Sequence, residues 1–579
     1  MRLTPQIVLV PVAAVIGFLL LFDTLSPSTA SPVPSPVVAD QAVSGSWYCA
    51  AGDTNEGRTT AVVFAPVPGE QPAPTDVLVS TFGEGRNEPG SETRVLPEDV
   101  RVDELPSGRS SIGVSARWWG RPAVLSRVWR VGGSEFPSGW VAGPCESTPS
   151  ANWYLPGLST DGGGEARLIL ANPFEGDATA TVTLATPEGR LQPRRLENLH
   201  VANHSVLRIV LNEFAPEQAD LAVIVHVRAG RLVSEGVQSF NAAIGGVDGV
   251  TLVKAAPATA LRWTIPWLEV ADRVGEDEEG DQDGVESWLW IANPSDEAAD
   301  VQINLHTPQG AAPPGLGGEG GAAPTEGDLS LESLQVEPGS VLRLDVADLL
   351  PGGAGVAGVT IESTNEVPIV ASAATVRRDP AAALSALAIQ LGAPRGDPTW
   401  VWSVPPPVDR TTHLHVVNLG EAPASLDVRY HTGEGQLVTL DRELTVPAGA
   451  LLDVDLTGAV GDASQLTVYV SSDQPIVAGY RSLNIEGRPD LVVGLGASSI
   501  TWQGGGQVPT ALHRPELVRQ LGTGDQPSPD PAGTPTSDPS PTPVPSPAPT
   551  VPAGPSPTAP SSPPETGSPP DGSDSTDAP

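Results

Sequence analysis

Three stretches of the chain share one pattern of apolar and polar positions. In each stretch an asparagine is followed by apolar residues eight, ten and twelve positions later, and a glycine closes the unit at seventeen. A period of two is that of a half-buried β-strand, and the asparagine, followed by proline in two copies, marks the turn before it. The pattern predicts three homologous β-rich units. The stretches are residues 168–189, 289–310 and 414–435, with Asn172, Asn293 and Asn418 at the turns.

Each unit continues with the same order of predicted elements. A turn and a strand follow, then a hairpin-like pair of strands, and a last strand leads into a tryptophan that opens the next unit. These tryptophans are Trp153, Trp263 and Trp400, and Trp502 holds the same position after the last unit. About seven or eight short strands in roughly 100 residues are typical of an immunoglobulin-like β-sandwich, whereas propeller blades repeat at roughly 40–50 residues. We therefore expect an all-β fold of tandem immunoglobulin-like β-sandwiches.

Residues 47–145 have the same rhythm in a weaker form, beginning at Trp47. We interpret this segment as a divergent first copy. The predicted sandwiches are residues 46–148, 149–257, 258–395 and 396–505.

The third copy contains two insertions, an acidic run at 276–286 and a Gly/Pro-rich stretch from 311 to about 325. Asp281 and Asp283 place carboxylates at alternate positions, as calcium-binding loops do. A third ligand before the glycine and a distal glutamate at the proper spacing are missing. The spacing therefore favours a solvated loop.

The two ends of the chain differ from its middle. Residues 1–25 contain an uncharged apolar run from Ile7 to Phe22. This run fits an uncleaved transmembrane helix or a cleaved signal peptide ending near Ala30, and both alternatives stay open. Either one exports the bulk of the protein, as the positive-inside rule also predicts from Arg2. Residues 26–45 form a Pro/Ser linker, and residues 506–579 a Pro/Ser/Thr-rich tail that we expect to be disordered.

The 579 residues carry 31 basic and 69 acidic side chains, a net charge of −38. The basic residues are arginines except for one lysine, Lys254. A negative field of this size disfavours nucleic acid and anionic lipid headgroups as partners. Part of the excess lies in the tail and in the acidic run, so the folded units are less acidic than the total indicates.

Two cysteines, Cys49 and Cys145, lie at the ends of the first predicted sandwich. In an exported protein an isolated pair favours a disulfide bond. Their spacing does not fit a zinc site, and no C-x-x-C motif points to redox catalysis.

No motif in the sequence assigns a catalytic, cofactor-binding or metal-binding residue. A nucleophile elbow, a zinc-protease motif and a phosphate-binding loop are all absent. His413 and His415 alternate on one strand face and could chelate a metal, but the equivalent residues of the other copies are not ligands. We therefore expect an ordinary outward face there. His306 and His431 share the repeat position of Ala185, which we interpret as a surface position at a strand end.

Trp288 and Trp290 give the sharpest ligand hypothesis. Two tryptophans on one face of a strand, beside an acidic loop, could stack on sugar rings. The alternative, which we favour, is that they pack under that loop or at a seam between sandwiches.

Several short motifs resemble an uncharacterised family of membrane-anchored or secreted proteins from high-GC Gram-positive bacteria, catalogued as a domain of unknown function. They are the N-terminal apolar run, a W-x-C opening at residues 47–49 with its partner in 143–145, the A-N-P turns and the P-I-V-A strands. The fourth copy departs from it, with Asn418 followed by Leu419. The resemblance implies an architecture and a location, and no activity or ligand.

The predicted function is therefore an extracytoplasmic, membrane-tethered scaffold of the cell envelope without catalytic activity. Envelope proteins or cell-wall polysaccharide are the expected partners. A polysaccharide-binding protein that uses exposed tryptophans is the alternative, and an undetected envelope hydrolase is a remote one.

Overall fold

The computed structural model describes residues 44–498, apart from positions 51, 56–57, 69–73, 97–98, 110, 132–138, 242–248, 272–283, 313–333, 351–354, 380–383, 408, 434–436, 441–442, 462, 464 and 485–490. The described residues all belong to one compact unit, residues 1–512, and a second unit comprises residues 513–579. The predicted N-terminal helix, the disordered tail and nearly all of the two insertions lie outside the described residues. Within the described part, no helix has the length and apolarity needed to cross a membrane.

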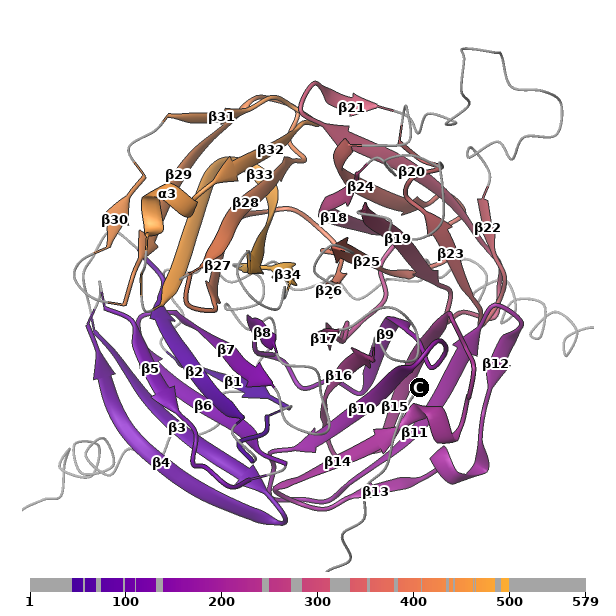
Figure 1. Cartoon of the computed structure of the whole chain (residues 1–579). Helices are drawn as coiled ribbons and strands as arrows, with labels where there is room; N and C mark the ends of the chain where they lie inside the picture. The colour runs from indigo at the N-terminus through magenta and orange to yellow at the C-terminus, as the bar shows by residue number, and fades with distance from the viewer. Residues whose placement is uncertain are drawn as a thin grey trace, which may run out of the picture. The chain divides into compact units, whose positions relative to one another are not determined.

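The described chain is almost entirely β-sheet, which confirms the all-β prediction. Six sheets form three sandwich-like pairs, and one nine-stranded sheet folds into the two layers of a fourth (Figure 1). We number them sandwich 1 to sandwich 4. Sandwich 1 has one sheet in the order β1 (Ser44–Cys49), β6 (Gly113–Gly120), β3 (Thr75–Gly83), β4 (Arg86–Val95) and another in the order β5 (Arg101–Glu104), β2 (Thr59–Pro66), β7 (Ala123–Val131), β8 (Gly139–Pro144).

Sandwiches 2 and 3 repeat this strand order. In sandwich 2 the first sheet has the order β9 (Asn152–Leu158), β15 (Leu221–Ala229), β11 (Ala178–Thr186), β12 (Gly189–Leu191), and β13 (Leu199–Val201) also pairs with β11. The second sheet has the order β14 (Ser205–Val210), β10 (Gly164–Asn172), β16 (Val233–Phe240), β17 (Gly249–Lys254). In sandwich 3 the first sheet has the order β18 (Arg262–Val270), β24 (Gly355–Ser363), β20 (Ala299–Thr307), β21 (Gly310–Ala312), and β22 (Leu334–Val336) also pairs with β20. The second sheet has the order β23 (Val341–Asp345), β19 (Gly284–Ala292), β25 (Val370–Asp379), β26 (Leu384–Leu391).

In sandwich 4 one long strand, β33 (Leu466–Asn484), takes part in both layers and replaces the hairpin-like pair of the other copies. Its first half pairs with β27 (Asp397–Val404) and β29 (Ala424–His431), and its second half with β28 (Arg410–Asn418) and β34 (Leu491–Leu495). The smaller elements are β30 (Val438–Thr439), β31 (Leu444–Val446), β32 (Leu451–Asp455), β35 (Ala497–Ser498), the 3₁₀ turns η2 (Arg194–Leu196) and η3 (Leu211–Glu213), and the short helix α3 (Thr457–Val460).

The repeated asparagine holds the same buried turn in all three copies. Asn172, Asn293 and Asn418 are fully buried, and each Nδ2 donates to at least two backbone carbonyls. For Asn293 these are Glu297 O at 2.7 Å and Val336 O at 2.9 Å, while Oδ1 accepts from the Ser295 amide at 2.9 Å. An amide with donors and an acceptor is needed to satisfy all three backbone groups, so no other side chain replaces it easily.

The glycine that closes the repeat also has a physical reason. Gly189 and Gly310 have φ angles of 119° and 126°, which a residue with a Cβ rarely adopts. Each begins the short strand that folds back on its neighbour, β12 on β11 and β21 on β20.

The four sandwiches contact one another in a closed cycle. We call the sheet that contains β1, β9 or β18 the opening sheet, and the sheet that contains β8, β17 or β26 the closing sheet. In sandwich 4 the same names denote the layer of β27 and the layer of β34. The closing sheet of each sandwich contacts the opening sheet of the one before it: β14 contacts β3, β25 contacts β9, β28 contacts β18, and β7 and β8 of sandwich 1 contact β27 of sandwich 4. Sandwich 1 is therefore a neighbour of sandwich 4, although sandwiches 2 and 3 lie between them in sequence.

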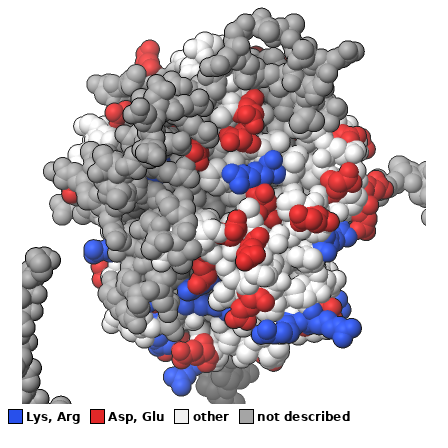
Figure 2. Space-filling model, turned by 45° about the vertical axis from the view of Figure 1, so that its right-hand side comes forward, with Lys and Arg blue, Asp and Glu red and all other residues white. Residues whose placement is uncertain are grey.

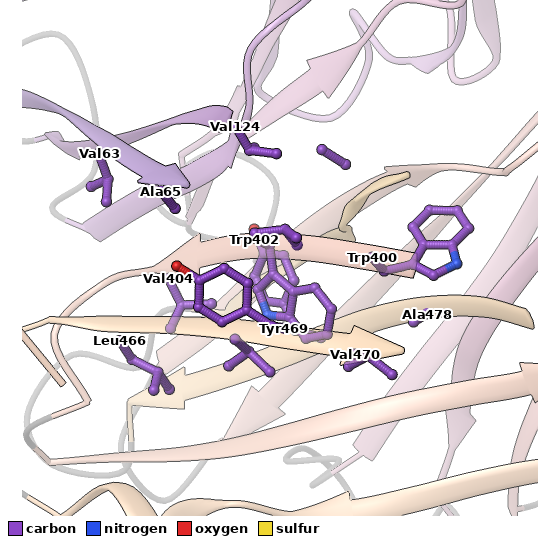
Figure 3. Close-up of a cluster of buried hydrophobic side chains, with 14 of the residues drawn as sticks. Val63, Ala65, Val124, Trp400, Trp402, Val404, Leu466, Tyr469, Val470 and Ala478 are labelled. Carbon is purple, nitrogen blue, oxygen red and sulfur yellow. The ribbon is translucent and has the colours of Figure 1, made fainter. Parts of the chain in front are cut away.

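Apolar cores run across these contacts. One buried cluster joins sandwich 1 to sandwich 4, and Figure 3 shows Val63, Ala65 and Val124 of sandwich 1 beside Trp402 and Val404 of sandwich 4. A second cluster joins sandwiches 1, 2 and 3. Burial of apolar side chains is the largest favourable term in folding, so the four sandwiches share their stabilising cores.

Candidate functional site: a cavity lined by four sandwiches

The end of each sandwich returns to its beginning. After the closing sheet the chain crosses over and pairs with the residue that follows the opening tryptophan: Tyr48 with Glu146, Tyr154 with Ala256, Thr264 with Ala393, and Val401 with Ala497. The opening tryptophans are buried, and each indole donates to a carbonyl of the closing layer: Trp47 to Ala123, Trp153 to Leu232, Trp263 to Ile369 and Trp400 to Ile476. The repeated tryptophan in the sequence thus marks the point where a hydrogen bond joins the two layers of each sandwich.

The four crossing segments line a single cavity. The edge strands that precede them contact one another in the order β8, β17, β26, β34 and back to β8. The cavity has a volume of about 380 Å³, and its wall takes residues from all four sandwiches. Its lining residues include the buried Trp263 and Trp400 and the exposed Ala258 and Arg395. Small-molecule sites are concave and mostly apolar with a few polar groups, which describes this wall.

The single lysine of the chain lies in the cavity wall as part of a charged network. Its Nζ lies 2.6 Å from Glu146 Oε1 and 3.1 Å from Glu235 Oε1. Behind the wall, Arg127 donates from Nη1 to Glu235 Oε2 at 2.9 Å and from Nη2 to Oε1 at 3.3 Å. The side chains of Arg127 and Glu235 have no exposed surface. The network crosses the contact between sandwiches 1 and 2, and the backbone amide of Ala50 also donates to Glu235.

The electrostatics of this network favour a charged lysine. Burial alone would lower the pKa of Lys254, but the Glu146 and Glu235 carboxylates outweigh it and raise the pKa above its usual value. Lys254 is therefore an ammonium at neutral pH. An ammonium does not act as a nucleophile, so the geometry gives Lys254 a binding or structural role.

The sequence hypothesis for Trp288 and Trp290 meets a different geometry. Trp290 is 2 % exposed, and its indole donates to Asp220 Oδ1 of sandwich 2 at 2.8 Å. Trp288 is half-buried, meets Trp290 edge to face at 5.6 Å, and is covered by the Arg343 guanidinium at 4.6 Å. An exposed sugar platform is therefore the wrong description of Trp290, which instead lies in the seam between sandwiches 2 and 3.

The same repeat position of sandwich 4 is also buried, and the predicted outward face is wrong there. His415 has no exposed surface and stacks on Trp267 of sandwich 3 at 5.4 Å between ring centroids. His413 is partly exposed and lies 2.8 Å from Asp453. Ile169, three residues before its turn asparagine like Trp290 and His415, is 2 % exposed. In sandwiches 3 and 4 a neighbouring sandwich covers this position.

His306 and His431, predicted as surface residues, are buried as well. His306 Nδ1 lies 2.9 Å from the Gly449 carbonyl of sandwich 4, and Nε2 lies 2.8 Å from Thr360 Oγ1. Their equivalent Ala185 is also buried, so this repeat position belongs to the interior in all three copies. Within the residues that the structure describes, no group of three or more His, Cys, Asp or Glu side chains is placed to hold a metal ion.

Stability is expected to fall with acid because of His415. Burial lowers its pKa to about 3, the Asp453 carboxylate opposes the shift, and the positive charges of Arg481 and His413 add to it. An unfolded histidine has a pKa of about 6.5, so the contribution is complete above that pH and is lost as pH falls toward 3. Between pH 7.5 and 5 it amounts to about 2 kcal/mol.

Urea unfolding at these two pH values measures this loss. In His415→Phe, which keeps a ring against Trp267, about 2 kcal/mol of the pH dependence should vanish. His200→Phe, at an exposed position, should keep the wild-type dependence. Equal pH dependence in wild type and His415→Phe would contradict the assignment.

The predicted disulfide is confirmed. Cys49 and Cys145 are bonded, lie 96 positions apart in sequence, and are both buried. The bond joins β1 in the opening sheet to the segment that follows β8 in the closing sheet, next to Glu146 of the cavity wall.

Sequence reasoning missed the cavity and its charges. Lys254 was visible as the only lysine, and Glu235 lies between valines at 233 and 237 in a strand. A charge inside an apolar strand is an indication of a buried pair. Their other partners, Arg127 and Glu146, come from sandwich 1, so the pattern of the two strands of sandwich 2 does not reveal the network.

The comparisons with known proteins give a family without an activity. A family model described as "Family of unknown function (DUF5719)" matches residues 136–395 and 392–487, more than half of the chain. The chain belongs to this family. The two DUF5719 matches meet at residues 392–395, within the cavity-lining segment that ends sandwich 3.

Other comparisons add little to the DUF5719 assignment. The search of curated proteins found no match. One similar solved structure, titled "Crystal Structure of Thermotoga maritima 1070", is 15 % identical, covers 18 % of this chain and 95 % of its own, and has a TM-score of 0.17.

Proposed function

We propose that this protein is an extracytoplasmic structural or protein-interaction scaffold of the bacterial cell envelope, held at the membrane by its N-terminal segment and without catalytic activity. The observation that carries the proposal is the continuity of the apolar cores from one sandwich to the next. A body built in this way keeps its binding surfaces in fixed relation, whereas sandwiches on flexible linkers do not.

Location rests on two features. The apolar run Ile7–Phe22 has the composition of an export signal or anchor, and the buried disulfide suits an oxidising compartment. We also infer that each sandwich is immunoglobulin-like, which its antiparallel sheets and strand number support.

The surface charge favours protein or neutral polysaccharide partners. Figure 2 shows acidic side chains spread over one face, with basic ones interspersed and no large basic patch in view. An acidic surface of this kind repels nucleic acid and anionic lipid.

Crosslinking on intact cells tests the proposal, and the composition dictates the reagent. Amine-reactive crosslinkers would find only the N-terminal amine and the ion-paired Lys254. A membrane-impermeant reagent directed at carboxylates should instead capture the chain together with specific envelope proteins. A protein in which Ser/Gly residues replace residues 7–22 is the control and should stay inside the cell uncaptured. Recovery of the wild-type chain only from the cytoplasm, with both cysteines reduced, would contradict the proposal.

A further inference from the structure

The cavity between the crossing segments is a built site that the scaffold proposal does not use. Its wall combines the buried Trp263 and Trp400 with the charged residues Glu146, Lys254 and Arg395. The volume of about 380 Å³ falls within the range of roughly 300–1,000 Å³ that small-molecule sites occupy.

The charges of the site have a net positive sign in a strongly acidic chain. Glu146, Lys254 and Arg395 line the cavity, which gives one negative and two positive charges. Glu235 and Arg127 behind the wall add one of each sign, so the sum is +1. Arg395 is exposed at the mouth and makes no ion pair with another residue in the described ranges.

Lys254, in the cavity wall, has one ammonium N–H that its two ion pairs do not use. Its ammonium carries three N–H groups, of which the contacts with Glu146 and Glu235 use two. Arg395 is exposed and Lys254 is half-buried, so both cations are open to a carboxylate in the cavity.

We propose that this cavity binds a small amphipathic carboxylate, with its linear apolar body against Trp263 and Trp400 and its carboxylate between Arg395 and Lys254. The apolar wall provides burial for the chain, and the net positive charge selects an anionic over a cationic headgroup. The proposal is independent of the scaffold role.

Titration calorimetry of the full-length protein with decanoate tests it, since about ten carbons suit a site at the small end of the range. One decanoate should bind per chain, and each pair of methylenes added between hexanoate and decanoate should tighten binding about ten- to fifteenfold. Decylamine, of equal length and opposite charge, should bind at least about tenfold more weakly than decanoate.

Two variants locate the site. A side chain at Gly143 would start in open space, with only Leu252 Cδ2 at 3.8 Å, so Gly143→Leu should fill part of the cavity and weaken decanoate binding at least about tenfold. Arg395→Glu, at an exposed position, should weaken it about fivefold or more. Gly458→Leu in α3 and Arg94→Glu on β4 are matched controls and should bind as wild type.

The proposal is overturned if decanoate shows no saturable binding, if decylamine binds equally well, or if folded Arg395→Glu and Gly143→Leu both retain wild-type affinity. Circular dichroism and the urea midpoint establish that each variant is folded.

Discussion

Replacing Glu235 by glutamine is expected to lower the free energy of unfolding by about 3 kcal/mol or more. The side chain is fully buried between Arg127 and Lys254, and glutamine keeps its shape while removing the negative charge. Breaking a buried ion pair on one side leaves an uncompensated charge out of contact with water, which costs about 3–5 kcal/mol. Urea unfolding at neutral pH measures the change.

Two further variants separate charge from packing. In Arg127→Met with Glu235→Met both signs are removed together, and Lys254 keeps Glu146, so most of the loss should be recovered. The exposed pair Arg262–Glu362 is the matched control, and Glu362→Gln should cost less than about 1 kcal/mol. A loss for Glu235→Gln no larger than that of Glu362→Gln would contradict the account of the network.

Replacing Asn293 by alanine is expected to cost about 2–4 kcal/mol. The change removes three hydrogen bonds and leaves the carbonyls of Glu297 and Val336 and the amide of Ser295 without their partner in a buried turn. Asn293→Asp should be no better, because a carboxylate cannot donate to two carbonyls.

The comparison for this variant is Asn304→Ala on β20, which is half-buried and should change the free energy by less than about 1 kcal/mol. Asn172→Ala and Asn418→Ala should resemble Asn293→Ala, since their hydrogen bonds are the same. Equal stability of Asn293→Ala and Asn304→Ala would show that the repeated asparagine has another role.

The repeat pattern predicted the interior of each sandwich well. The turn asparagines and the opening tryptophans recur because each satisfies a local requirement. The asparagine makes backbone hydrogen bonds in the turn, and the tryptophan makes a hydrogen bond between the two layers. Such requirements are the same in every copy, so comparison of copies reveals them.

The contacts between sandwiches could not be predicted in the same way. Trp290 and His415 hold one repeat position with different residue types, which resembles the variability of an exposed surface. Each in fact meets a different neighbour, Asp220 in sandwich 2 for Trp290 and Trp267 in sandwich 3 for His415. Residues at such positions adapt to their partner, so variation among copies does not mean exposure.

The candidate cavity escaped prediction for a related reason. Its wall is assembled from four crossing segments whose sequences are short and rich in Ala, Gly and Pro, and none carries a motif by itself. Only closure of the cycle brings Glu146 of sandwich 1, Lys254 of sandwich 2 and Arg395 of sandwich 3 to one space.

The central claim is that the four sandwiches form one mutually stabilised body. Reduction of the Cys49–Cys145 bond should destabilise sandwich 1 by about 4–5 kcal/mol, since the bond closes a loop of 96 residues. Because the core of sandwich 1 continues into sandwich 4, hydrogen exchange in β27 and β33 should accelerate together with that in β2 and β7.

Hydrogen exchange with mass spectrometry, on the oxidised and the reduced protein, is the most direct measurement. We expect faster exchange after reduction in residues 397–404 and 466–484 as well as in sandwich 1. Acceleration confined to residues 46–148, with β27 and β33 unchanged, would contradict it and would mean that the sandwiches are independent.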